Sequence, residues 1–327
     1  NANIKVLEYK ALENLGISLK EFTENHRKSP REYQYEAFDI IRENYLAHKK
    51  SSWFLMATGL GKTRVAALII EDWLNRFENS EIAFLVPTLP LVNQTEKALW
   101  PYLSKFTHTH LLTGSEKPSF SGGVTIAAYD SFKNWIDTYP GRYDLIIFDE
   151  AHHAPADTYV KALETAAPKF LLGMTATPWR GDKRILDDVF GEKCYEMSIV
   201  EGMQKGYLAE VDYQMFADTI DWEDVSQLLQ EGITIKDLNK KLFILPRDNA
   251  IADNLKTLKE NNELTQGLCF CPRQKHADLF AANLRSVGID AQSFHSGIPP
   301  VKKAKILKDF YNKKIQILVT VDALNEG

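Results

Sequence analysis

The sequence predicts an α/β protein with two doubly wound parallel sheets. Apolar runs without internal alternation recur along the chain and are separated by segments whose apolar residues have helical spacing, which is typical of strands covered on both faces. One of these runs leads into a loop with two glycines, and a helical pattern follows that loop directly. A second strand and helix rhythm begins near residue 266, and 327 residues are enough to build two cores.

Five continuous apolar runs predict the strands of the first sheet. They lie at residues 53–56, 82–86, 124–128, 145–148 and 170–174. Small or polar residues follow the carboxyl end of each run. Because ligands of doubly wound sheets bind beyond the carboxyl ends of the strands, we expect the functional residues to lie in these short segments.

The same rhythm divides the chain into four parts. We expect an N-terminal helical remnant, a first domain, a connector and a second, truncated domain at residues 1–25, 26–208, 209–265 and 266–327. The connector is polar and contains helical pieces at residues 224–229 and 247–260. The second domain has predicted strands and helices at residues 268–271, 274–287, 302–310 and 315–319.

Composition limits the classes of function. The formal net charge is −5, so no basic field of the whole protein attracts nucleic acid, and any such contact must be local. The three cysteines, Cys194, Cys269 and Cys271, are too few for a disulfide framework and fit a reducing cytoplasm. Cys269 and Cys271 share one face of a predicted strand, which indicates core packing. No apolar stretch of the sequence is long enough to span a bilayer, so we expect no membrane contact.

The loop at residues 57–63 has the pattern of a phosphate-binding loop. Gly59 and Gly61 allow backbone N–H groups to approach phosphate oxygens, and the start of the following helix adds its dipole. In such a loop Lys62 reaches the β- and γ-phosphates, and the hydroxyl of Thr63 binds Mg²⁺. A plain glycine turn is the simpler alternative, and the strand and helix on either side disfavour it.

Two adjacent carboxylates follow the predicted strand at residues 145–148. Asp149 stands where a P-loop enzyme needs a carboxylate to hold Mg²⁺ through water, and Glu150 stands where one polarises the attacking water. Capping of the next helix is the simpler interpretation, but the phosphate-binding loop in the same chain favours catalysis. His152 and His153 do not predict a zinc site, because adjacent side chains diverge and no further ligand is near in sequence.

From about residue 31 onward, the order of the motifs resembles that of superfamily 2 helicases and translocases. The loop has Met56 where the general P-loop pattern has glycine, and this variant is the one that helicases use. Residues 57–63 match motif I of the family, and Asp-Glu-Ala-His at residues 149–152 matches motif II. The resemblance implies two RecA-like domains, ATP and Mg²⁺ as cofactors, and nucleic acid as a partner.

The resemblance also implies roles for individual residues. Those expected to bind the nucleotide are Arg31, Gln34, Thr58, Gly59, Leu60, Gly61, Lys62, Thr63, Arg64 and Gly327. Those expected in catalysis are Lys62, Thr63, Asp149, Glu150 and His152, and those expected in coupling are Thr175, Ala176 and Thr177. Those expected to contact the nucleic-acid backbone are Thr88, Gln94, Thr113, Gly114, Ser131, His295, Ser296, Gly297 and Thr320. Taken alone, most of this last group would be read as helix caps or turns.

Two segments favour one branch of the superfamily. Thr-Ala-Thr-Pro at residues 175–178, followed by Arg180, is similar to the translocating subunits of restriction enzymes and to XPB-type DNA helicases, as is the run at residues 149–155. This branch implies duplex DNA as the partner, nuclease or methyltransferase modules or subunits, and a bacterial or archaeal cytoplasm. A relative that senses or remodels RNA is an alternative, because the expected contacts reach the backbone rather than the bases.

Two other functions stay open at the level of sequence. An ATP-gated clamp or sensor would bind nucleic acid without processive movement, and a P-loop ATPase with no nucleic-acid partner would be indifferent to added DNA. Residues 320–327 resemble motif V of the family, and in the family motif VI follows motif V and supplies arginines that stabilise the transferring phosphoryl group. Because these would follow residue 327, we expect residues 1–327 to bind ATP but to hydrolyse it weakly.

Overall fold

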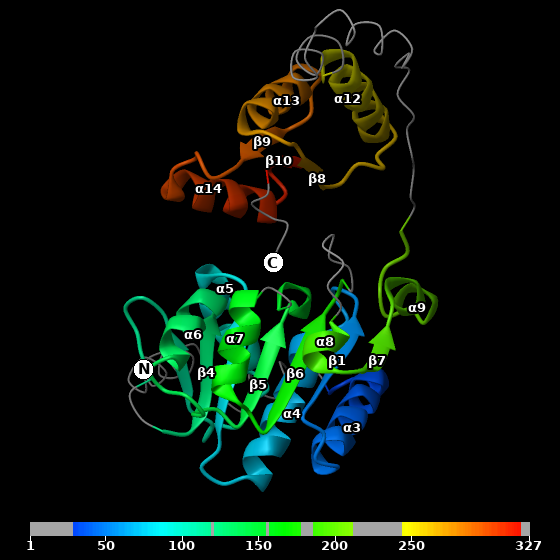
Figure 1. The fold of residues 1–327 in the computed structure, drawn as a ribbon. Helices are drawn as coiled ribbons and strands as arrows, with labels where there is room; N and C mark the ends of the chain where they lie inside the picture. Colours follow the sequence, from blue (N-terminus) through cyan, green and yellow to red (C-terminus); the bar gives the residue numbers. More distant parts are fainter. Residues whose placement is uncertain (1–28, 119–120, 155–156, 178–185, 212–243, 322–327) are drawn as a thin grey trace, which may run out of the picture. The chain divides into compact units, whose positions relative to one another are not determined.

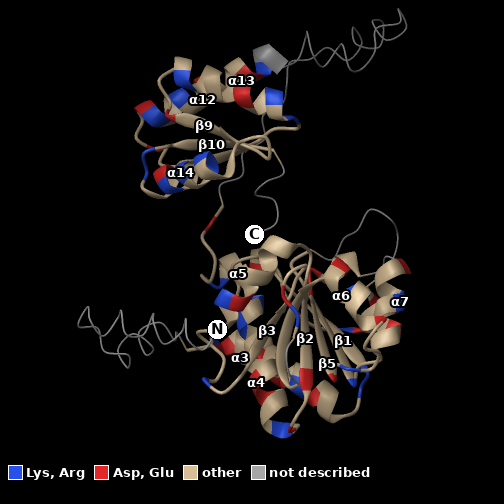
Figure 2. Cartoon of the chain, turned by 90° about the vertical axis from the view of Figure 1, so that its left-hand side faces the viewer, with Lys and Arg blue, Asp and Glu red and all other residues tan. Residues whose placement is uncertain are grey.

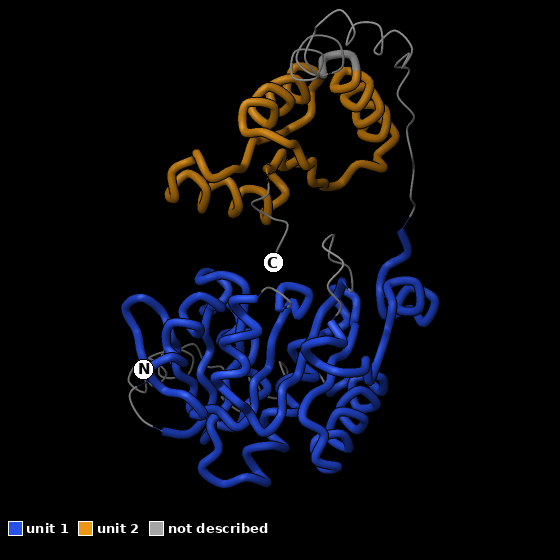
Figure 3. The backbone as a smooth tube through the Cα atoms, in the orientation of Figure 1, with its two compact units in different colours: residues 1–212 blue, residues 213–327 orange. Residues whose placement is uncertain are grey.

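The computed structural model describes residues 29–118, 121–154, 157–177, 186–211 and 244–321. Its contacts divide the chain into two compact units, unit 1 up to Asp212 and unit 2 from Tyr213 (Figure 3). The predicted end of the first domain, residue 208, lies shortly before this division. The predicted helical segments at residues 1–25 and 224–229, together with Arg180 and Gly327, lie outside the described residues.

Unit 1 is built on a seven-stranded sheet with the order β3-β4-β2-β5-β6-β1-β7 (Figure 1). The strands are β1 (Ser51–Met56), β2 (Glu81–Val86), β3 (Thr109–Leu112), β4 (Gly123–Ala128), β5 (Leu145–Asp149), β6 (Phe170–Thr175) and β7 (Lys193–Met197). Every pair of neighbouring strands is parallel. The doubly wound α/β fold is therefore confirmed, and the five predicted strands correspond to β1, β2, β4, β5 and β6.

Helices cover both faces of this sheet. They are α3 (Glu32–Leu46), α4 (Lys62–Arg76), α5 (Leu89–Leu99), α6 (Tyr129–Ile136), α7 (Asp157–Ala166), α8 (Asp187–Phe190) and α9 (Ile199–Gln204), with a 3₁₀ turn, η1, at Ala151–His153. Apolar residues of α3, α4 and α5 form one core with the sheet, and those of α6, α7 and α8 form a second core on its other face. The strands β1, β2, β4, β5 and β6 are buried on both faces, which explains their continuous apolar sequences.

Unit 2 contains a three-stranded parallel sheet with the order β8-β10-β9. Its elements are α12 (Ile244–Glu260), β8 (Gly267–Phe270), α13 (Gln274–Ser286), β9 (Ala291–Phe294), α14 (Pro300–Tyr311) and β10 (Ile317–Thr320). The sequence places α12 in the connector, whereas in the structure Ala252 of α12 lies in one core with Phe280 and Leu284 of α13. Cys269 and Cys271 pack in that same core, as predicted.

Charged residues of both signs are interspersed along the helices of each unit (Figure 2). This pattern agrees with the small net charge of −5. None of the described helices combines the length and the apolarity that crossing a bilayer requires.

Candidate active site

The parallel sheet of unit 1 brings the candidate residues to the carboxyl ends of its strands, in two groups. We call this side of the sheet its carboxyl edge. The adjacent strands β5, β6 and β1 end at Asp149, at Thr175 and just before the glycine loop. The strands β3, β4 and β2 form the other half of the sheet and lead into the segments that contain Thr113, Ser131 and Thr88. Because all strands point the same way, the residues predicted for the nucleotide and those predicted for nucleic acid occupy neighbouring halves of one edge.

The loop after β1 has the backbone geometry of a phosphate cradle. Gly59 and Gly61 have φ values of +87° and +86°, which residues with a Cβ rarely adopt. A Cβ built on Gly61 would lie 2.5 Å from Nε2 of Gln34, and one on Gly59 would lie 3.1 Å from Cδ2 of Leu208. Gly61 is the N-cap of α4, so the positive end of the helix dipole and the N–H groups at the very start of α4 lie at the loop. These features fit a bound triphosphate.

Gln34 holds the loop from the side of α3. Its Nε2 donates to the carbonyl of Leu60 at 2.8 Å, and its Oε1 accepts from the backbone N–H of Arg31 at 3.0 Å. The hydroxyl of Tyr33 donates to the same Leu60 carbonyl at 2.8 Å. The guanidinium of Arg31 lies 5.5 Å from the ring centroid of Tyr207. In this structure the amide of Gln34 is therefore engaged with the protein, and it supports the phosphate-binding loop.

Arg64 turns toward the segment that follows α5. Its guanidinium carbon lies 4.1 Å from the ring centroid of Tyr102, which is a close cation–π contact. Thr58 and Gly59, at the tip of the loop, are exposed, whereas Leu60 is buried. The loop thus presents its glycine-rich tip to solvent and anchors its other end in the core.

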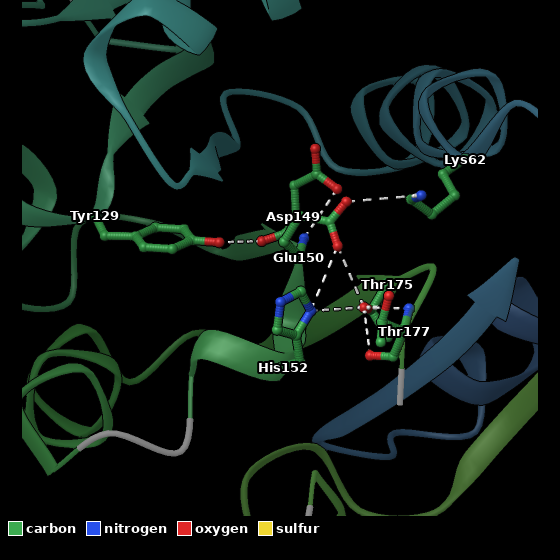
Figure 4. A network of polar contacts seen from close by, with 7 residues as sticks. All are labelled: Lys62, Tyr129, Asp149, Glu150, His152, Thr175 and Thr177. Atoms are coloured by element: carbon green, nitrogen blue, oxygen red, sulfur yellow. Dashed lines mark hydrogen bonds and ion pairs between the residues drawn. The ribbon is translucent and has the colours of Figure 1, made fainter. Parts of the chain in front are cut away.

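Lys62, Glu150 and His152 form one network with Thr175 (Figure 4). The Nζ of Lys62 lies 3.8 Å from Oε1 of Glu150. The other oxygen of Glu150, Oε2, lies 3.4 Å from Nδ1 of His152 and 3.3 Å from the hydroxyl of Thr175. The structure therefore brings together predicted residues from the loop after β1, the turn after β5 and the end of β6.

Thr175 is fully buried, and its hydroxyl lies near more hydrogen-bond acceptors than its single proton can bind. Nδ1 of His152 lies 2.9 Å from it, and the carbonyl of Thr177 lies 2.9 Å from it. The backbone N–H of Thr177 also donates to it, at 3.1 Å. A hydroxyl has one O–H donor, so donating to Glu150 and donating to the Thr177 carbonyl exclude each other. The Thr175 hydroxyl therefore lies between the carboxylate of Glu150 and the segment at residues 175–177.

Asp149 carries a proton more readily than an ordinary aspartate. Burial, together with the neighbouring charge of Glu150, raises the pKa of Asp149 to about 7, although Lys62 acts in the opposite direction. Its Oδ1 accepts from the backbone N–H of Glu150 at 2.9 Å. A divalent cation would relieve the repulsion between the two carboxylates. Asp149 and Thr63 therefore fit Mg²⁺, which is usually held by one or two protein oxygens, by water and by phosphates.

Of the residues predicted to contact nucleic acid in unit 1, three are exposed. These are Thr88, at the N-cap of α5, Gln94 on α5 and Gly114 after β3. Thr113 is half-buried, and its hydroxyl accepts from the backbone N–H of Glu116 at 3.0 Å. Ser131 is half-buried in the first turn of α6. The edge of unit 1 therefore presents hydroxyl, amide and backbone groups beside the candidate nucleotide site.

In unit 2 the structure separates the predicted residues into exposed and buried ones. His295 is 6% exposed, and its Nε2 lies 3.2 Å from Oδ1 of Asp278, while Thr320 is fully buried. Ser296 and Gly297 are exposed. The groups of this loop that face solvent are thus those of Ser296 and Gly297, and His295 lies in the interior as a support of the loop.

Sequence reasoning missed three residues that contact the site. The hydroxyl of Tyr129 donates to the backbone carbonyl of Asp149. Tyr33 holds the Leu60 carbonyl, and Leu208 packs beside Gly59. Tyr33 and Tyr129 each stand next to or near a motif, but their contacts depend on which strands are neighbours, and this information is absent from local patterns.

The fold and this network together define a RecA-like P-loop domain. Two family models match the chain in succession: "Type III restriction enzyme, res subunit" over residues 27–180, and "Helicase conserved C-terminal domain" over residues 247–327. These matches confirm the resemblance to superfamily 2 helicases and translocases, and the chain is similar to restriction-enzyme subunits and to an XPB-type translocase.

Three curated relatives illustrate this similarity. A subunit of the type I restriction enzyme EcoAI from Escherichia coli is 27% identical, over 77% of this chain and 33% of its own length. The DNA 3'-5' translocase XPB2 of Sulfurisphaera tokodaii is 30% identical, over 52% and 36%. The protein assigned as the mitochondrial ATP-dependent helicase irc3 of Schizosaccharomyces pombe is 26% identical, over 91% and 50%. The chain thus spans half or less of the length of these relatives.

Two solved structures show the same fold. A fragment assigned to the HsdR subunit of a type I restriction enzyme from Vibrio vulnificus YJ016 has a TM-score of 0.63 at 26% identity, covering 96% of this chain and 59% of the other. The Type ISP restriction-modification enzyme LlaBIII, solved bound to DNA, has a TM-score of 0.66 at 17% identity, covering 92% and 25%.

Proposed function

We propose that the protein is an ATP-dependent motor that couples hydrolysis to movement along duplex DNA. The observation that carries this proposal is the edge of the unit 1 sheet. There the Lys62, Glu150 and Thr175 network lies beside exposed groups that suit a sugar-phosphate backbone. In a motor of this kind the nucleotide site and the site that holds the DNA are coupled, so that hydrolysis at the first changes the affinity of the second.

Within the nucleotide site, each side chain has a distinct task in the proposal. The loop at residues 57–63 binds the phosphates, with Lys62 on the β- and γ-phosphates, while the Thr63 hydroxyl binds Mg²⁺ and Asp149 holds it through water. When bound, MgATP supplies the phosphoryl group, and the metal offsets the charge that develops on it. Glu150 orients and deprotonates the attacking water, and His152 fixes the direction of the Glu150 carboxylate.

The DNA contact in this proposal is made to the backbone and is not sequence-specific. In unit 1 it uses Thr88, Gln94 and Gly114, which are exposed. In unit 2 a locally basic helix follows the exposed Ser296 and Gly297. The lysines of α14 and of the turn after it are Lys302, Lys303, Lys305, Lys308, Lys313 and Lys314. A local cluster of this kind can neutralise phosphates although the chain as a whole is acidic.

DNA is preferred to RNA because of the relatives. The curated relatives include a DNA translocase and a restriction-enzyme subunit. In the proposal the complete protein works with nuclease or methyltransferase modules or subunits, in a bacterial or archaeal cytoplasm. The second candidate is an ATP-gated clamp or sensor, including one that acts on RNA, which would use the same backbone contacts without processive movement.

Displacement of a labelled third strand from a DNA triplex tests the proposal and separates it from the clamp. The full-length protein with ATP is expected to release the third strand, because a moving motor strips it from the duplex. Glu150→Gln is the matched control, since this variant should still bind ATP and DNA but should not move. A protein that binds the duplex and hydrolyses ATP without releasing the third strand would support the clamp and contradict the motor.

A further inference from the structure

Tyr129 connects the two halves of the sheet edge. It begins α6 directly after β4, and its hydroxyl donates to the backbone carbonyl of Asp149 at the end of β5 (Figure 4). The strands β4 and β5 are not neighbours, because β2 lies between them. The phenol side chain therefore spans a full strand to reach the candidate catalytic turn.

The ring of Tyr129 is held in place by aromatic contacts. Its centroid lies 4.3 Å from that of Phe148 with an interplanar angle of 25°, and 5.2 Å from that of Tyr159 with an angle of 63°. Tyr129 is 3% exposed. A buried ring with two such partners has little freedom, so its hydroxyl is presented to Asp149 in a fixed direction.

The carbonyl that Tyr129 holds belongs to the peptide group between Asp149 and Glu150. The N–H of that same peptide donates to the carboxylate of Asp149 at 2.9 Å. A peptide group is planar, so fixing its oxygen also fixes its N–H, and with it the Asp149 carboxylate. The next residue, Glu150, has φ +46° and ψ +53°, a left-handed conformation that a glutamate adopts only when its surroundings impose it.

We propose that Tyr129 is a positioning residue that clamps this peptide plane and so sets the directions of both carboxylates, the metal-holding Asp149 and the base Glu150. Tyr129 is followed in α6 by Asp130, which is exposed, and by Ser131, which is expected to contact the nucleic-acid backbone. A shift at the start of α6 when a strand binds is then carried by the phenol to the Asp149 peptide. The transmission from α6 rests on the proposed function, whereas the positioning of the Asp149 peptide by Tyr129 does not.

Tyr129→Phe in the full-length protein tests whether Tyr129 positions the Asp149 peptide, because this change keeps the ring and removes only the hydroxyl. We expect the Mg²⁺ concentration for half-maximal binding of labelled ADP to rise about 3- to 10-fold, the size expected for the loss of one hydrogen bond. The kcat for ATP is expected to fall by a similar factor, while the KM for ATP and the affinity for duplex DNA stay within about twofold of wild type. Stimulation of the ATPase by DNA should be lost or much reduced.

Tyr143→Phe is the matched control, since Tyr143 is a buried tyrosine of the same core whose ring lies against Phe132 rather than Phe148. The proposal is overturned if Tyr129→Phe matches Tyr143→Phe in Mg²⁺ dependence and in kcat. A wild-type ATPase that no nucleic acid stimulates would contradict the proposed function. The Mg²⁺ titration would still decide whether Tyr129 positions the Asp149 peptide, because that titration depends on neither DNA nor turnover.

Discussion

Lys62 and Glu150 form an ion pair across the candidate site, with Nζ 3.8 Å from Oε1 and side chains that are 12% and 27% exposed. The pair joins the loop after β1 to the turn after β5, and β6 lies between these two strands. A triphosphate in the loop would compete for Lys62, because it offers more negative charge at the same place. Nucleotide binding is then expected to free Glu150 for the attacking water, so the pair restrains the base until ATP arrives.

Lys62→Ala is expected to abolish ATP binding or hydrolysis, because it removes the charge that opposes the β- and γ-phosphates. Binding of a fluorescent ATP analogue and phosphate release measure this directly. Lys205→Ala, which changes an exposed lysine on the surface of unit 1, should behave as wild type. Wild-type nucleotide affinity and turnover in Lys62→Ala would show that the loop does not bind the triphosphate.

Glu150→Gln should separate binding from turnover. The amide keeps the size of the side chain and leaves Asp149 in place to hold Mg²⁺, but it cannot accept a proton from water. We expect ATP affinity within a few-fold of wild type and a fall in kcat of about 10²-fold or more. If ATP binding and turnover are lost equally, Glu150 has a structural role instead.

Thr175→Val removes a buried hydroxyl while it keeps the shape of the side chain. Glu150 and His152 each lose a hydrogen-bonding neighbour, so the base is less well oriented. We expect kcat to fall about tenfold while nucleotide affinity is retained. Thr165→Val, which removes a hydroxyl on α7 away from the network, is the control. Equal kcat values in the two variants would mean that the Thr175 hydroxyl does not support Glu150.

The raised pKa of Asp149 predicts a pH dependence of stability in the absence of Mg²⁺ and nucleotide. The folded protein keeps the Asp149 proton up to a pH of about 7, whereas the unfolded chain releases it near pH 4. The contribution of Asp149 to the free energy of unfolding is therefore highest below pH 4 and falls as the pH rises through 7, because the buried carboxylate must then ionise in the folded protein. Asp149→Asn cannot ionise. It should raise the unfolding temperature relative to wild type at pH 8, by about 4 °C or more, and not at pH 4. An equal difference at both pH values would contradict the raised pKa.

Salt should weaken DNA binding only moderately. Each neutralised phosphate releases counterions, and for about three or four contacts the slope of log K against log salt is roughly −3 to −4. Replacing Lys302 and Lys305 of α14 by Gln should reduce that slope, whereas replacing Lys49, which is remote from these segments in sequence, should not. Titration of a labelled duplex at several salt concentrations gives the slopes. An affinity that does not change with salt would argue against contacts to the backbone.

The sequence was most informative where strands are covered on both faces. β1, β2, β4, β5 and β6 are continuous apolar runs because helices pack on each side. The edge strands β3 and β7 were not predicted. β3 contains Thr109 and His110, and β7 alternates exposed and buried residues because only part of it is covered. Short polar strands at an edge resemble loops when only local patterns are available.

The site was predicted from residues whose chemistry is recognisable, such as Lys62 and Glu150. The contacts that organise them depend on the sheet order. Tyr129 reaches Asp149 past β2. Arg64, which was expected to bind the nucleotide, packs its guanidinium on the ring of Tyr102. Sequence spacing does not reveal which strands are neighbours, so these contacts could be found only in the structure.

The most direct test of the central claim is the ATPase rate of the full-length protein with no nucleic acid, single-stranded DNA, duplex DNA and duplex RNA, compared side by side. Glu150→Gln in the same assay corrects for contaminating ATPase. The proposed function predicts that duplex DNA raises the rate several-fold and more than duplex RNA does. A rate that is the same in all four conditions would show that the nucleotide site is not coupled to nucleic acid, and would contradict the account.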